Sequence, residues 1–69
     1  MRLSARNQLS GTIVEVAPGA VTTTVNVELT GGDTITSSIT RAVADELGLV
    51  PGNAVRVIVK ASDVILGVT

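Results

Sequence analysis

The stretch that decides the fold is residues 21–39, which read VTTTVNVELTGGDTITSSI. Over residues 21–29 every second position shares one face, and this period of two predicts a strand with one buried side. The residues on that face are Val21, Thr23, Val25, Val27 and Leu29. The sequence Thr-Gly-Gly-Asp at residues 30–33 predicts a hairpin turn, because glycine tolerates the backbone angles of tight turns. Residues 34–39 predict the partner strand, so the stretch forms an antiparallel hairpin.

Further strands are predicted on either side of this hairpin. Residues 9–16 predict a first strand, and Gly11 within it indicates a bend or a β-bulge. Residues 54–60 carry valine at alternate positions and predict a fourth strand. Residues 64–68 are mainly apolar, follow a break at Ser62 and Asp63, and predict a short fifth strand.

One helix is predicted, over residues 40–48. Thr40 is suited to the N-cap, and Gly48 is suited to the left-handed residue that ends a helix. The resulting order is β-β-β-α-β-β with a bent first strand, which is typical of a small oligonucleotide/oligosaccharide-binding (OB) barrel. The predicted fold class is therefore all-β with one short helix, in a five-stranded OB-type barrel whose end the helix covers.

The composition indicates a single small domain that self-associates. The chain has 69 residues, 45% of them hydrophobic, with neither Cys nor His, and its mean hydropathy is +0.54. Residues 1–69 are enough for one core, and a core of this size is usually reinforced by disulfides, a metal or oligomerisation. The absence of Cys and His excludes disulfides and most transition-metal sites, so we expect a homo-oligomer with apolar interfaces.

The same composition argues against several other classes of protein. Phe, Tyr and Trp are absent and the net charge is −1, whereas barrels that bind single-stranded nucleic acid use aromatic platforms in a basic groove. No catalytic set is recognisable, and the scattered carboxylates have no metal-ligand spacing. No apolar run is long enough to span a bilayer and no secretory leader is visible. We therefore expect a cytoplasmic binding protein, with no enzymatic activity, no nucleic-acid partner and no membrane contact.

Two segments near the ends of the chain place a cation beside small hydroxyl residues. They are Ser4-Ala5-Arg6 and Lys60-Ala61-Ser62. Arg offers a planar fork of donors, Lys a mobile charge and Ser a hydroxyl, which together suit a tetrahedral oxyanion. Each basic residue has an ordinary interpretation as well, because solvated cations and lysines that protect a sheet edge are common. Thr40 is first of all an N-cap, although a helix start also offers N–H groups to an anion.

The residue order in these and other segments resembles that of the molbindin (Mop) family of small molybdate-binding proteins. The matching segments are Ser-Ala-Arg-Asn-Gln-Leu at residues 4–9 followed by Gly11, Ile-Thr at residues 39–40, Leu-Gly-Leu at residues 47–49, and Val-Lys-Ala-Ser at residues 59–62. They lie at matching spacing over nearly the whole chain. The resemblance implies the OB-type barrel already predicted, assembled as a hexamer (a trimer of dimers) with oxyanion sites between subunits.

The resemblance also implies roles for individual residues. One subunit would contribute Ser4, Arg6, Lys60 and the amide of Ala61, and its neighbour would contribute Thr40. Further candidates at this site are Ser62 and the amide of Ala5. A second class of site, near threefold axes, would use amides of the turn Gly19-Ala20-Val21. The family often has a Ser three positions after the Thr, where this chain has Val43.

The function that the resemblance implies is intracellular binding and storage of molybdate, with tungstate as a substitute. Molybdenum would be held as the oxyanion, without direct coordination by side chains. Two alternatives stay open at this point. The first is a structural assembly module with a vestigial anion pocket, which the Val43 difference favours. The second is a nucleic-acid-binding barrel, which the missing aromatic residues disfavour.

Overall fold

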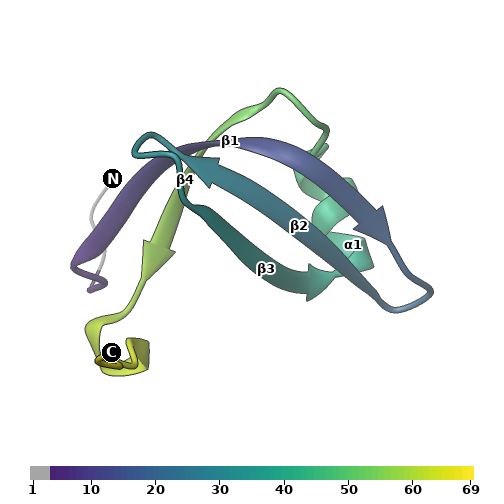
Figure 1. Cartoon of the computed structure of the whole chain (residues 1–69). Helices are drawn as coiled ribbons and strands as arrows, with labels where there is room; N and C mark the ends of the chain where they lie inside the picture. The colour runs from purple at the N-terminus through teal and green to yellow at the C-terminus, as the bar shows by residue number, and fades with distance from the viewer. Residues whose placement is uncertain (1–3) are drawn as a thin grey trace.

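The computed structural model describes residues 4–69, which form one curled antiparallel sheet and a short helix (Figure 1). The strands are β1 (Asn7–Pro18), β2 (Thr22–Leu29), β3 (Thr34–Thr40) and β4 (Ala54–Val59). Helix α1 (Arg41–Leu47) follows β3, and one turn of 3-10 helix, η1 (Ala61–Asp63), follows β4. The strand order is β3-β2-β1-β4, so β1 and β2 are central and β3 and β4 form the edges.

Strand β1 is long enough to serve both halves of the sheet. Its first half pairs with β4 and its second half with β2, and Gly11 and Thr12 pair with both neighbours. The register with β2 shifts between Ile13 and Glu15, so Val14 is the extra residue of a β-bulge, which bends the strand. The bend in this strand was predicted at Gly11. The bulge lies three residues further on, and Gly11 instead marks the place where the two pairings overlap.

The hydrophobic core lies on the concave side of the sheet. Ile13, Val25 and Val27 are only 1%, 3% and 4% exposed. Half-buried side chains surround them: Val16, Leu29, Ile35, Ile39, Leu49, Val55 and Val57. The predicted buried face of residues 21–29 is thus confirmed within β2, where Thr23 is also buried. Val21 is the exception, since it precedes β2 in a turn and is 75% exposed.

The predicted hairpin turn and helix are confirmed. The Leu29 N–H donates to the Asp33 carbonyl at 2.7 Å, and Gly32 adopts a positive φ of 100° inside this turn. Thr40 is the N-cap of α1, and Gly48 ends the helix with φ 65° and ψ 38°. Within residues 4–69, no helix is long and apolar enough to cross a membrane.

The predicted fifth strand over residues 64–68 is wrong for this structure. The described part of the chain forms a four-stranded sheet rather than a closed five-stranded barrel. After β4 the turn η1 redirects the chain, and residues 64–69 have no regular secondary structure and no ladder partner. The side chains of Ile65, Leu66 and Val68 are 93%, 88% and 101% exposed. Alternation and apolarity predict a strand, but a strand also needs an edge that it can reach.

Candidate functional site

The two cation-bearing segments come together at one end of the β1–β4 pair. Asn7 opposes Val59 in the antiparallel register, and the Asn7 side-chain amide also donates to the Val59 carbonyl at 3.2 Å. Residues 4–6 lead into Asn7, and residues 60–62 continue from Val59. The pairing therefore brings segments that are more than fifty residues apart in the sequence to the same edge of the molecule.

The polar side chains of these segments are turned toward solvent. Ser4, Arg6, Lys60 and Ser62 are all exposed, and Ala5 between the first two is half-buried. The ion pair found within residues 4–69 joins Arg41 to Asp45 elsewhere in the molecule. No carboxylate of the described chain is therefore paired with Arg6 or Lys60, and both cations are available to an incoming anion.

The turn η1 adds main-chain donors to this edge. Its hydrogen bonds run from the Asp63 N–H to the Lys60 carbonyl at 2.9 Å and from the Val64 N–H to the Ala61 carbonyl at 3.2 Å. In the part of the chain that the structure describes, turns and loops contain several main-chain hydrogen bonds. The N–H groups of Ala61 and Ser62 donate none of them. Exposed N–H groups beside a cation are the donors that bind oxyanions. Within the same residues there is no cluster of carboxylates that would hold a metal cation.

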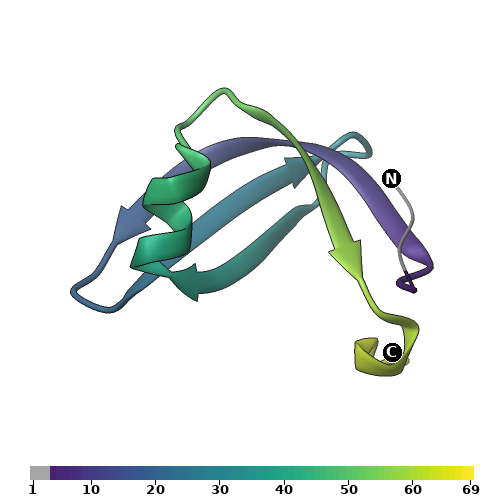
Figure 2. The same cartoon turned by 180° about the vertical axis from the view of Figure 1, so that it is seen from behind.

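Thr40 does not join these groups in the same chain. It ends β3 beside α1, at the opposite end of the sheet from the start of β1 and the end of β4 (Figures 1 and 2). Its Oγ1 accepts a hydrogen bond from the Val43 N–H at 3.2 Å. The hydroxyl proton remains available, because a threonine hydroxyl is a donor as well as an acceptor. Val43 is itself 42% exposed, so an apolar side chain lies where a hydroxyl would extend the polar surface.

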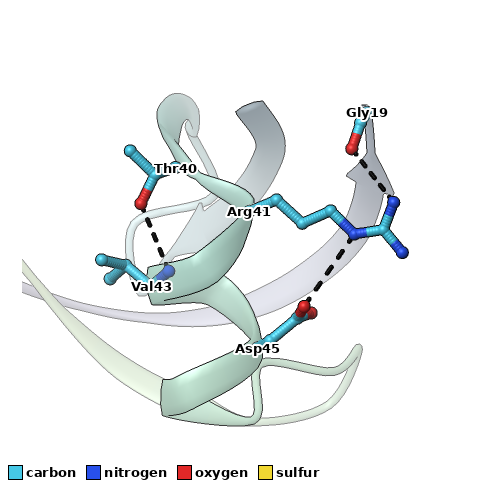
Figure 3. Close-up of polar contacts among 5 residues, drawn as sticks. All are labelled: Gly19, Thr40, Arg41, Val43 and Asp45. Carbon is cyan, nitrogen blue, oxygen red and sulfur yellow. Dashed lines mark hydrogen bonds and ion pairs between the residues drawn. The ribbon is translucent and has the colours of Figure 1, made fainter. Parts of the chain in front are cut away.

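The turn predicted as a second site lies next to the start of the helix. The Arg41 N–H donates to the Val21 carbonyl at 2.8 Å. The Arg41 guanidinium reaches across the turn and donates from Nη1 to the Gly19 carbonyl at 3.3 Å, while its Nε lies 3.9 Å from Asp45 Oδ2 (Figure 3). The Gly19 N–H is occupied by the Thr22 carbonyl at 2.8 Å, which closes the turn.

Arg41 is the residue of this region that sequence reasoning missed. The only local signal was its position between Thr40 and Asp45, four residues before a carboxylate on the same helix face. That signal indicates an ordinary surface ion pair. The contact with Gly19 spans 22 positions in the sequence and depends on how the helix meets the turn.

The family model for the TOBE domain matches residues 3–66 of the chain. Among curated proteins, a probable molybdenum-pterin-binding protein of Haemophilus influenzae is 38% identical over 68 residues, covering 99% of both chains. Molybdenum-pterin-binding protein 2 of Clostridium pasteurianum is 42% identical over 66 residues, covering 96% of this chain and 97% of its own.

Solved structures give the same relationship. MopII from Clostridium pasteurianum superposes with a TM-score of 0.90 at 40% identity, covering 97% of this chain and all of its own. The cytoplasmic molybdate-binding protein ModG, in a form with molybdate bound, superposes with a TM-score of 0.94 at 49% identity. This chain is covered completely in that match and corresponds to 49% of the ModG chain. The protein therefore belongs to the TOBE-domain proteins and, within them, to the molbindin (Mop) family.

Proposed function

We propose that this protein binds molybdate, and tungstate in its place, at interfaces between identical subunits and stores it in the cytoplasm without transforming it. The observation that carries the proposal is the pairing of Asn7 with Val59. Because of it, a Ser-Ala-Arg segment and a Lys-Ala-Ser segment share one edge with exposed amides. Relatives named for binding molybdate or molybdenum-pterin support the choice of ligand, and ModG is described as cytoplasmic.

The donor set fits a tetrahedral dianion. Arg6 and Lys60 together carry two positive charges, which balance the charge of molybdate without a basic protein surface. Hydroxyls of Ser4 and Ser62 and the amides of Ala5 and Ala61 replace water around the oxygens. Each hydrogen bond to a charged group contributes about 1.5–3 kcal/mol, so a few fixed donors are sufficient for tight binding. Sulfate has shorter bonds to oxygen, so its oxygens would fit the same set of donors less well.

Two observations support our proposal that the site lies between subunits: the position of Thr40 and the exposed apolar surface. Thr40 ends β3 and Arg6 directly precedes β1, and these two strand ends lie at opposite ends of the sheet (Figure 2). A neighbouring copy would therefore bring the Thr40 hydroxyl to the oxyanion. The concave face contains an open cavity of about 360 Å³ between β3 and β4, lined by residues such as Ile35, Leu47 and Val57. The apolar segment 64–68 of another copy is a suitable cover for this cavity, since apolar surface of this extent is unfavourable in water. The hexamer implied by the resemblance, a trimer of dimers, is the assembly that we propose.

The turn of residues 19–21 is proposed as the second class of site. The amides of Ala20 and Val21 have no main-chain acceptor within residues 4–69 outside the strand ladders, and both residues are exposed. Repetition of the turn around a threefold axis would gather several such amides around one oxyanion.

Isothermal titration with molybdate, repeated in excess sulfate, tests the proposal. We predict uptake that survives sulfate, with one site of the first class per chain, because each copy contributes one Arg6–Lys60 set and one Thr40. Arg6→Ala should weaken binding more than tenfold, because it removes charge-assisted bonds. Arg56→Ala is the matched control, since Arg56 is also exposed but lies on β4 opposite Ser10. No binding to the wild type, confirmed by dialysis, would favour the structural assembly module that Val43 suggests.

A further inference from the structure

Arg41 makes more contacts with the turn of residues 19–21 than a surface ion pair would require. Its main-chain N–H donates to the Val21 carbonyl at 2.8 Å, and its guanidinium donates to the Gly19 carbonyl at 3.3 Å. The partner carboxylate of Asp45 is 73% exposed and 3.9 Å away, so solvent screens that attraction. The hydrogen bond from the guanidinium to the Gly19 carbonyl therefore links α1 to the turn (Figure 3).

The contact with Gly19 fixes the direction of a neighbouring donor. The peptide bond between Gly19 and Ala20 is trans, as are all peptide bonds in the described chain. In a planar trans peptide the carbonyl and the next N–H point in opposite directions. Because the Gly19 carbonyl accepts from Arg41, the Ala20 N–H points away from Arg41. The hydrogen bond also polarises this peptide and makes its N–H a better donor.

We propose that Arg41 is a positioning residue for the turn site: it holds the Gly19–Ala20 peptide so that the Ala20 N–H faces a tetrahedral oxyanion. The inference rests on the proposed function and deepens its second site. The ligand class is an oxyanion, because the donor that Arg41 orients is a main-chain amide. Arg41 itself lies on the other side of the peptide and acts through Ala20.

The test compares Arg41→Ala and Arg41→Lys with Asp45→Asn. In the oxyanion-free protein, nuclear magnetic resonance gives the chemical shift and hydrogen-exchange rate of the Ala20 amide. Arg41→Ala should shift this resonance and slow its base-catalysed exchange, because the peptide loses the hydrogen bond that makes its N–H a better donor. Arg41→Lys should restore part of both effects because lysine also donates to a carbonyl. Asp45→Asn keeps the Gly19 contact and should leave the Ala20 amide as in the wild type. An unchanged Ala20 amide in Arg41→Ala would overturn the inference.

Molybdate titration provides the second readout. In the wild type, the turn sites should appear as a binding phase separate from that of the Arg6–Lys60 sites. Arg41→Ala should weaken the turn phase about tenfold, as expected for a lost hydrogen bond that orients a donor, and leave the other phase unchanged. An equal change in both phases would contradict the role of Arg41 and leave the proposed function intact. A missing turn phase in the wild type would contradict both the role of Arg41 and the second class of site, but not the Arg6–Lys60 site. Failure of both wild-type phases would instead refute the proposed function.

Discussion

Gly11 is the position at which a single added methyl group should disturb the fold most clearly. A Cβ placed there would lie 2.6 Å from Val27 Cγ1, 2.9 Å from the Glu28 carbonyl oxygen and 3.4 Å from Leu29 Cδ2. The Val27 side chain is 4% exposed and the Glu28 oxygen belongs to the β1–β2 pair, so neither moves without displacing the core or the ladder. Overpacking of this kind costs about 1–3 kcal/mol.

The substitution Gly11→Ala should therefore lower stability by about 1–2 kcal/mol, after a gain of about 0.4–1 kcal/mol from the stiffer unfolded chain. For a domain of this size the loss corresponds to a Tm lower by roughly 5–15 °C. Urea and thermal unfolding, followed by circular dichroism at equal subunit concentration, measure both quantities.

Gly31→Ala is the matched control for this experiment. A Cβ at Gly31 meets no heavy atom within 4 Å, and Gly31 is not among the glycines with positive φ. Its stability should stay within about 0.5 kcal/mol of the wild type, or rise slightly. Equal stability of the two variants would refute the argument that β1 and β2 approach too closely at Gly11 for a side chain.

Three further changes have defined outcomes. Thr23→Val should raise the free energy of unfolding, measured by urea titration, by about 1 kcal/mol. The reason is that Thr23 Oγ1 is buried without a hydrogen-bond partner in the described chain. A loss of stability would indicate that the hydroxyl has a partner after all. Val43→Ser should tighten molybdate binding up to about tenfold in calorimetry by adding a donor one turn from Thr40, and an unchanged affinity would exclude position 43 from the site. Leu66→Asp should shift the assembly toward smaller species in analytical ultracentrifugation. Leu66 is 88% exposed in one chain and would be buried by a neighbouring copy, where a carboxylate is unfavourable. An unaltered mass would exclude segment 64–68 from the interface.

The parts of the fold that were predictable depend on short-range chemistry. The buried face of β2 follows from a period of two, and the ends of α1 follow from a threonine that caps main-chain N–H groups and a glycine that tolerates positive φ. The bulge at Val14 and the missing fifth strand were not predictable in this way. Both depend on which strands meet, and residues 64–68 are apolar whether or not a partner edge is within reach.

The same distinction between short-range chemistry and the meeting of distant elements applies to the candidate site. Residue type was enough to select Arg6 and Lys60, and antiparallel pairing of the strands beside them explains why their segments meet. The resemblance alone implied that Thr40 comes from a neighbouring copy, and this stays a prediction; its position at the end of β3 was not predicted as part of the site. Arg41 was missed because its contact with Gly19 joins two elements whose relative placement is set by the whole sheet.

The most direct test of the central claim is the location of molybdenum in crystals grown with molybdate, from anomalous diffraction at the molybdenum absorption edge. The account predicts a peak at a subunit interface, bounded by Arg6 and Lys60 of one copy and Thr40 of another. A peak enclosed by one chain alone, or no peak beside Arg6 and Lys60 in crystals that contain molybdate, would contradict it.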